Sequence, residues 1–220
     1  MINETDTHNI LGQQILPEPT LRRLPWYLAY VDILKARGEE HVSSTHIARA
    51  LNVDSSQIAK DLSFLNIRGK TRIGYEVDTL EEKLTEALGF RTLHRAYVYG
   101  VGSLGSALMR DSGLSNYGLQ IVAGFDTNPD TVGRDDLGVP VYHPDDIEEV
   151  METTPADICI LTVPAEAAQE AADAAIAAGM KAIWNFTPYR VKVAEGIVMT
   201  NTSIYAHLAL IYNRLSVKDS

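Results

Sequence analysis

The stretch Arg95-Ala96-Tyr97-Val98-Tyr99-Gly100-Val101-Gly102-Ser103-Leu104-Gly105-Ser106 decides the fold of this chain. A short apolar strand runs into a G-x-G-x-x-G turn, and a helix follows, an order typical of dinucleotide-binding folds. Gly100 permits the tight turn, Gly102 lets a pyrophosphate approach the backbone, and Gly105 lets the helix pack on the strand. A glycine-rich turn that binds no ligand is the simpler alternative. The cofactor contacts expected here are Gly100, Val101, Gly102, Ser103, Leu104 and Gly105.

The next predicted strand, Gln120-Ile121-Val122-Ala123-Gly124-Phe125, ends at Asp126. A carboxylate there accepts hydrogen bonds from both hydroxyls of an adenine ribose and repels a 2′-phosphate, so the sequence favours NAD(H) over NADP(H). Two later strands end near Pro164 and Phe186, and ligands of open α/β sheets bind at such carboxyl ends. The additional cofactor contacts expected there are Thr162, Val163, Pro164, Asn185 and Phe186.

From Arg95 onward the hydrophobic pattern alternates between strands and helices, which predicts an α/β fold with a doubly wound parallel sheet. The expected strands are 95–99, 120–125, 157–163, 181–185 and 196–200, and the expected helices are 103–112, 144–153 and 166–178. A last amphipathic helix is expected over 203–215. Its apolar stripe consists of Ile204, Leu208, Ile211 and Leu215, with Tyr205 and Tyr212 beside it. Such a stripe predicts either a dimer interface or packing of the helix on its own sheet.

Roughly ninety residues precede the glycine turn, too many for a leader. Their pattern predicts a helix-turn-helix, because two short helices, at 46–51 and 57–65, are separated by a short turn. The caps available for these helices are Ser43, Ser44 or Thr45 for the first and Ser55 or Ser56 for the second.

Other segments complete this predicted domain. A longer helix is expected over 21–34, with Pro19 and Pro25 on either side of its start. Residues 70–77 are expected to form the strand pair of a wing, and 78–88 an acidic helix that serves as a linker or a packing helix. The N-terminal part is therefore predicted to be a winged-helix domain.

The net charge of the chain is −10, which argues against non-specific coating of nucleic acid. Residues 41–75 are an exception, with five basic residues against Asp54 and Asp61. A solvated surface would explain such a cluster, but its place on a helix-turn-helix favours DNA. We expect helix ends at phosphates or bases, the second helix in the major groove, and the wing near the backbone or minor groove. The expected DNA contacts are Ser43, Ser44, Ser55, Ser56, Gln57, Lys60, Ser63, Lys70 and Arg72.

Composition indicates an ordinary globular protein. The 220 residues are 45% hydrophobic and 22% charged, and no apolar run approaches the roughly 20 residues of a membrane span. The polar start does not resemble a signal peptide. The single Cys159 fits a cytoplasmic protein without an internal disulfide. The expected divisions are a disordered leader over 1–16, a winged-helix DNA-binding domain over 17–90, an NAD(H)-binding domain over 91–200 and a C-terminal dimerisation helix over 201–220.

No catalytic constellation is evident. A dehydrogenase needs an acid or base beside the nicotinamide and a clamp for its substrate. His94, His143 and His207 have no evident carboxylate partner, and the predicted sheet uses nearly all of residues 91–200. We therefore expect neither catalytic residues nor a metal site, with an NAD-dependent oxidoreductase as the alternative. A domain that acts only through protein partners is a further alternative.

The order of these parts resembles the Rex family of redox-sensing transcriptional repressors, over about 17–216. The resemblance implies a homodimer with a domain-swapped C-terminal helix. It also implies binding to a palindromic AT-rich DNA operator. NAD+ would permit this binding, and NADH would release the protein from the operator. The blocks that carry it are Leu16-Pro17, Thr20-Leu21-Arg22-Arg23-Leu24-Pro25, Val42-Ser43-Ser44, Lys60-Asp61-Leu62-Ser63, Gly74-Tyr75, the glycine turn, Phe125-Asp126, Thr162-Val163-Pro164, and Asn185-Phe186 with Pro188.

Several positions depart from the family pattern. Ala59 replaces the arginine of Arg-Lys-Asp-Leu-Ser, Leu65-Asn66 replaces Phe-Gly, and Thr71-Arg72 replaces the Arg-Gly of the wing. Ser203 replaces the aspartate of Asn-Val-Asp, which the family associates with redox-dependent domain coupling through an arginine matching Arg23. A Rex-like paralogue with an altered operator or an altered ligand response is therefore an alternative.

Overall fold

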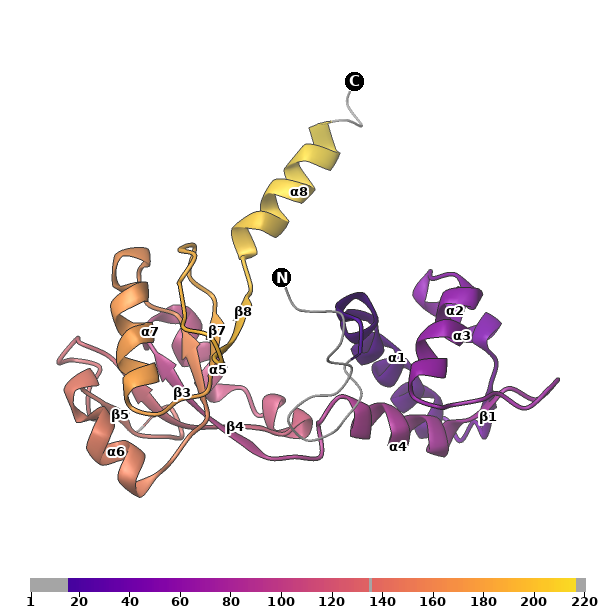
Figure 1. The fold of residues 1–220 in the computed structure, drawn as a ribbon, viewed down its shortest axis with the longest axis horizontal. Helices are drawn as coiled ribbons and strands as arrows, with labels where there is room; N and C mark the ends of the chain where they lie inside the picture. The colour runs from indigo at the N-terminus through magenta and orange to yellow at the C-terminus, as the bar shows by residue number, and fades with distance from the viewer. Residues whose placement is uncertain (1–15, 135, 217–220) are drawn as a thin grey trace. The chain divides into compact units, whose positions relative to one another are not determined.

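The computed structural model describes residues 16–134 and 136–216. The chain divides into two compact units, Met1–Arg91 and Thr92–Ser220 (Figure 1). The expected leader lies outside the described residues, apart from Leu16, which is buried in the core of the first unit. Every helix in the described ranges is too short or too polar to cross a membrane.

The first unit is a winged helix-turn-helix. Its elements are α1 (Glu18–Ala36), β1 (His41–Val42), α2 (Ser44–Leu51), α3 (Ser55–Phe64), β2 (Tyr75–Glu76) and α4 (Val77–Ala87). A tight turn joins α2 to α3, with Asn52 in the left-handed conformation at φ 52° and ψ 47°, which asparagine tolerates better than most residues. The strands β1 and β2 pair antiparallel. The core of the unit is formed by the inward faces of all four helices.

Helix α1 differs from its expected bounds, since it begins at Glu18 and contains Pro25. A proline inside a helix costs about 3 kcal/mol. Burial of Leu24, Leu28 and Val31, which lie on one face of α1 on both sides of Pro25, offsets that cost by roughly 1.5–3 kcal/mol for each side chain. The hydrophobic stripe therefore overrides the local signal for a helix start.

Two further local expectations are wrong. Asp54, rather than Ser55 or Ser56, caps α3, because its carboxylate accepts a hydrogen bond from the Ser56 backbone nitrogen at 2.7 Å. Residues 70–77 do not form a strand pair by themselves. The ribbon of the wing is β1 with β2, and 70–74 form a turn that the Lys70–Gly74 bridge closes. Strand β1, the partner of β2, is only two residues long. A segment of two residues is too short to give a periodic signal in the sequence.

A buried carboxylate joins α1 to α3. Asp61 accepts hydrogen bonds from Arg23 Nε at 2.7 Å, Arg23 Nη2 at 2.8 Å and Tyr27 Oη at 2.8 Å. Thr20 Oγ1 and Gln57 Nε2 also donate to it, each at 2.9 Å. Burial alone would raise the pKa of the Asp61 carboxyl, but the hydrogen bonds from Arg23, Tyr27 and Thr20 outweigh it and hold the pKa below its usual range. These five residues are called the Asp61 cluster below.

The second unit is a doubly wound sheet of six parallel strands in the order β5-β4-β3-β6-β7-β8. This order is that of dinucleotide-binding folds, in which the first three strands are added toward one edge of the sheet and the later strands toward the other edge. The strands are β3 (His94–Tyr99), β4 (Leu119–Phe125), β5 (Val141–Tyr142), β6 (Ile158–Leu161), β7 (Ala182–Asn185) and β8 (Val198–Asn201). The helices are α5 (Ser103–Arg110), α6 (Ile147–Thr153), α7 (Ala168–Ala177) and α8 (Ile204–Ser216), with 3-10 turns at Leu114–Tyr117, Pro144–Asp146 and Ala165–Ala167.

Alternate residues of β3 serve the two faces of this sheet. Tyr97 and Tyr99 join the core under α6 and α7, whereas Ala96 and Val98 join the core under α5. The sheet confirms the expected fold class. Strand β5 was not expected, because two residues are too few for a periodic signal. The expected helix over 144–153 begins with a 3-10 turn and becomes α-helical at Ile147.

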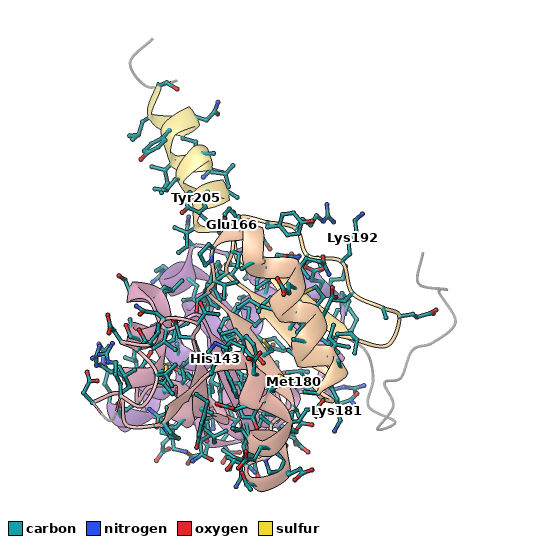
Figure 2. The ribbon with its side chains drawn as sticks, turned by 90° about the vertical axis from the view of Figure 1, so that its left-hand side faces the viewer. His143, Glu166, Met180, Lys181, Lys192 and Tyr205 are labelled. Atoms are coloured by element: carbon teal, nitrogen blue, oxygen red, sulfur yellow. The ribbon has the colours of Figure 1, made fainter. Side chains whose placement is uncertain are left out.

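Helix α8 does not pack on its own sheet. It extends from the end of β8 away from the rest of its unit (Figures 1 and 2), and none of its residues is buried. Ile204, Leu208, Ile211 and Leu215 of the predicted stripe are 48%, 37%, 51% and 57% exposed. Packing on the same sheet, one of the two predicted roles of this stripe, is therefore wrong.

Replacing Asp61 with asparagine should lower the free energy of unfolding at pH 7 by about 3 kcal/mol, because Arg23 loses its partner charge. This cost should shrink as the pH falls below about 4, because the unfolded chain then protonates the carboxyl while the folded chain keeps it ionised. The matched control is Asp54→Asn, which removes the same charge from α3 and leaves a good N-cap. Urea unfolding followed by circular dichroism measures both, and equal costs for the two variants would contradict the prediction.

Candidate functional site

The glycine turn is packed too tightly for side chains at two of its positions. Gly100 has φ +91°, and a Cβ there would lie 2.7 Å from the backbone nitrogen of Val163. A Cβ on Gly105 would collide with the Gly100 carbonyl oxygen. Thr162 Oγ1 donates a hydrogen bond to that same oxygen at 2.6 Å. Strand β3, helix α5 and the loop after β6 therefore converge on the Gly100 carbonyl.

Gly102 has a different role. A Cβ there would meet no atom within 4 Å, and its φ of −72° is ordinary for any residue. The fold itself therefore does not require glycine at this position. The open space lies at the start of α5, beside exposed Ser103 and Leu104, where the first N–H groups of a helix have no helical acceptor. A pyrophosphate fits such a place by charge and by hydrogen bonding.

Asp126 directly follows β4, lies beside the glycine turn and holds the turn in place. Its Oδ2 accepts a hydrogen bond from the Val101 backbone nitrogen at 2.7 Å, and its Oδ1 accepts one from the Asn128 backbone nitrogen at 2.8 Å. The remaining lone pairs of the half-buried carboxylate are available to the hydroxyls of a ribose. The sequence predicted the ribose contact but gave no signal for the hydrogen bond to Val101.

A pocket of about 320 Å³ opens at the carboxyl ends of β3, β4 and β6. Gly100, Asp126, Val163 and Pro164 of the expected cofactor contacts line it. Its wall also contains Tyr99, Phe125, His143, Asp145 and Glu170, none of which was expected to contact the cofactor. Tyr99 and Phe125 directly precede Gly100 and Asp126, so their positions in the motif could have identified them. His143 follows the short β5 and lies beside α7 (Figure 2), and it had no comparable signal.

The structure does not bring Asn185 and Phe186 to this pocket. Asn185 is 1% exposed, and its Nδ2 donates to Tyr189 O at 2.7 Å and to Asn201 Oδ1 at 2.9 Å. Its Oδ1 accepts a hydrogen bond from the Thr187 backbone nitrogen at 2.9 Å. Phe186 packs against Trp184, with ring centroids 4.7 Å apart. Neither side chain lines the pocket, and Phe186 is half-buried. Their contact with the cofactor stays a prediction.

The predicted DNA residues of the helix-turn-helix are exposed or half-buried. Ser43 Oγ caps α2 by accepting a hydrogen bond from the His46 backbone nitrogen at 3.1 Å, and Ser63 Oγ donates to Lys60 O at 2.6 Å. Gln57 is half-buried, and its Nε2 donates a hydrogen bond to Asp61 Oδ1 at 2.9 Å. Its contact with DNA stays a prediction.

The wing and the start of α2 enclose a depression of about 350 Å³. Ser43, Ser44, Lys70 and Arg72, four of the predicted DNA residues, line it. Arg72 is at the tip of the turn with φ +67°, a left-handed conformation that costs a non-glycine residue about 1–2 kcal/mol. The turn thus presents a cation at a position that is sterically better suited to glycine.

The basic residues of this surface lack ion-pair partners. Within the described part of the chain, none of the five basic side chains of residues 41–75 forms a salt bridge. By contrast, Lys35 and Lys83 of the same unit are paired with carboxylates. An unpaired positive surface on a chain of net charge −10 fits a polyanion such as DNA. These five residues are Arg49, Lys60, Arg68, Lys70 and Arg72.

A metal site or an acid–base catalyst would require a characteristic set of side chains among the described residues. Within residues 16–134 and 136–216, no three side chains of His, Cys, Asp or Glu gather as ligands of a metal ion would. His143 contacts Asp145, with Nδ1 3.2 Å from Oδ2, and the two side chains are 43% and 89% exposed.

Comparison with known families assigns both units. Residues 15–63 match the family described as "Putative DNA-binding protein N-terminus", and residues 92–189 match the family described as "CoA binding domain". A protein of Bacteroides fragilis, named redox-sensing transcriptional repressor Rex, is 56% identical over 204 residues, which cover 93% of each chain. A protein of the same name from Porphyromonas gingivalis is 57% identical over 200 residues, covering 91% of this chain and 92% of that protein.

Solved structures agree with these relatives. RSP in complex with β-NAD+ and operator DNA superimposes with a TM-score of 0.88 at 30% identity, covering 94% of this chain and 95% of that chain. RSP in complex with β-NADH superimposes with a TM-score of 0.83 at 31% identity, covering 94% and 97%. RSP itself is described as a Rex-family repressor.

Gly102→Ala should leave the free energy of unfolding unchanged and weaken the binding of NADH about tenfold or more, because the new methyl group occupies open space that the pyrophosphate needs. Isothermal titration calorimetry and urea unfolding measure the two effects. The paired variant is Gly105→Ala, which should unfold the second unit, because its methyl group collides with the Gly100 carbonyl. Full NADH affinity in folded Gly102→Ala would contradict the proposed course of the cofactor.

Proposed function

The chain belongs to the Rex family of redox-sensing transcriptional repressors, and we propose that it represses transcription in response to the ratio of NADH to NAD+. The observation that carries this function is the presence, in one chain, of an unpaired basic winged helix and a nucleotide site around Gly102 and Asp126. The second unit binds NAD(H), and the first binds DNA. Because the relatives are named repressors, the dinucleotide is a signal here and not a substrate.

The charge of the pocket favours NAD(H) as the ligand over nucleotides that carry an additional phosphate on the adenine ribose. Asp126, Asp145 and Glu170 all line it. Carboxylates repel a phosphate on the adenine ribose, whether it is the 2′-phosphate of NADP(H) or the 3′-phosphate of coenzyme A. The second unit is thus similar to the "CoA binding domain" family in fold, while its pocket favours a dinucleotide with a free ribose.

The DNA contacts follow from the exposed surface. We assign Lys60 and Ser63 of α3 to the major groove, and Lys70 and Arg72 of the wing to the backbone or minor groove. The serines at the starts of α2 and α3 place helix N-termini at phosphates. A repressor acts where the chromosome is, which in the bacterial relatives is the cytoplasm.

A fluorescence anisotropy titration tests this function. The operator duplex is first selected from a randomised library with the NAD+-bound protein, and we expect an AT-rich palindrome. NADH should weaken operator binding at least fivefold relative to NAD+, a coupling of about 1 kcal/mol. Gly102→Ala is the matched control, which should bind the operator but not respond to NADH.

The outcomes separate the alternatives. No selected sequence would contradict the repressor function. An operator that binds equally well with both cofactors would identify a paralogue with an altered response. Loss of absorbance at 340 nm when NADH is incubated with small carbonyl compounds would instead revive the oxidoreductase.

A homodimer through α8 is part of this proposal. A helix without a buried residue and with an apolar stripe is stable only against another surface. Because its own sheet does not cover the stripe, a second copy is the natural partner, and exchange of C-terminal helices between copies would bury it at low cost. Two-fold symmetry would then present two α3 helices to a palindrome.

Leu208→Asp with Ile211→Asp should convert the dimer to a monomer, because two charges would enter an apolar interface. The matched control is Asn213→Asp, which adds a charge to α8 outside the stripe and should remain dimeric. Sedimentation equilibrium measures the mass of each variant. A monomeric unmodified protein at micromolar concentration, or a dimeric double variant, would contradict the role of α8.

A further inference from the structure

The middle of helix α3 places two opposite charges back to back. Lys60 is exposed on the surface assigned to DNA, whereas the next residue, Asp61, is 0% exposed. A carboxylate beside phosphates would oppose binding, so its burial removes an unfavourable charge from the DNA surface. Burial of a charge is itself costly unless partners satisfy it. The chain nevertheless keeps a charged residue at this point, and its partners indicate what it does.

Those partners come from successive turns of α1. Thr20, Arg23 and Tyr27 lie on one face of the helix, and all three donate to Asp61. The Arg23 guanidinium forms two bonds, from Nε to Oδ2 and from Nη2 to Oδ1. A bidentate pair of planar groups fixes orientation as well as distance. An apolar contact would allow α3 to rotate or slide, because hydrophobic burial has no preferred direction.

The Asp61 cluster also holds the first turn of α3. Gln57 and Asp61 are one helical turn apart, so the Gln57 amide also fastens the start of α3 to the same carboxylate. Helix α1 packs along α4 and α2, and through Asp61 it is also anchored to α3. Resting on the DNA-binding function proposed above, we propose that Asp61 is a positioning residue, which fixes the rotation of α3 so that its exposed side chains meet the base edges of the operator.

The test compares operator binding with non-specific binding. Asp61→Asn, Thr20→Val and Tyr27→Phe each remove bonds of the cluster and leave Lys60, Lys70 and Arg72 in place. The control is Leu80→Ala, which removes a fully buried side chain from α4 and destabilises the same unit without touching Asp61. Anisotropy titrations use the selected operator and a scrambled duplex over a range of salt concentrations. All measurements are made at a temperature where circular dichroism shows each variant to be folded.

We expect Asp61→Asn to lose at least tenfold in operator affinity, with an unchanged affinity and salt dependence for the scrambled duplex. The single-hydroxyl variants should lose about threefold to tenfold, and Leu80→Ala should keep its discrimination. NADH affinity should stay the same in every variant, because the cofactor site is in the other unit. If Asp61→Asn does not fold, Thr20→Val and Tyr27→Phe decide the question.

Two outcomes have different meanings. Cluster variants that discriminate as well as Leu80→Ala would overturn the positioning role of Asp61 and leave the DNA-binding function intact. An unmodified protein that prefers no sequence would instead overturn the proposed function itself.

Discussion

The second unit depends on one close approach of backbone to backbone, at the Gly100 carbonyl. The start of α5 passes so near this oxygen that residue 105 has no room for a Cβ. The Thr162 hydroxyl, in the loop after β6, donates a hydrogen bond to the same oxygen. These contacts bring the ends of β3 and β6 together with the start of α5. This is the point where the order of the strands in the sheet reverses. The pocket and the open space beside Gly102 are consequences of that convergence. The glycine turn of the nucleotide site therefore depends on the absence of side chains at residues 100 and 105.

The first unit rests on the opposite kind of constraint. Its geometry depends on the presence of a charge, Asp61, whose carboxylate receives five hydrogen bonds from α1 and α3. A buried ion pair contributes little net stability, because desolvation offsets much of the attraction. Arrangements of α1 and α3 that separate Asp61 from Arg23 are disfavoured, however, because they leave a buried charge without a partner. Selectivity of geometry is what a DNA-reading helix needs, since a rotated helix would present the wrong side chains to the bases.

The sequence predicted what depends on local pattern and failed where long-range partners decide. The glycine turn, the alternation of strands and helices, and the helix-turn-helix are local signals, and the corresponding elements are present. The role of Asp61 depends on residues 34 to 41 positions away, and it looked like one acidic residue in a basic window. Asn185 lies at the end of a strand, as a ligand contact would, but its bond to Asn201 cannot be inferred without knowing that β7 and β8 are neighbours. The two-residue strands β1, β2 and β5 carry too little pattern to be recognised.

A redox switch needs coupling between the cofactor site of the second unit and the DNA-binding surface of the first. A cofactor shifts an equilibrium only through different affinities for two arrangements. The resemblance to the Rex family implies coupling between an aspartate before the last helix and an arginine matching Arg23. Here Ser203 occupies the aspartate position, where its Oγ accepts a hydrogen bond from Ala206 N at 3.1 Å. Serine keeps the helix cap but not the charge, and Arg23 already bonds Asp61 twice. An ion pair between the position of Ser203 and Arg23 is therefore absent from this chain, and the coupling implied by the resemblance cannot use it here.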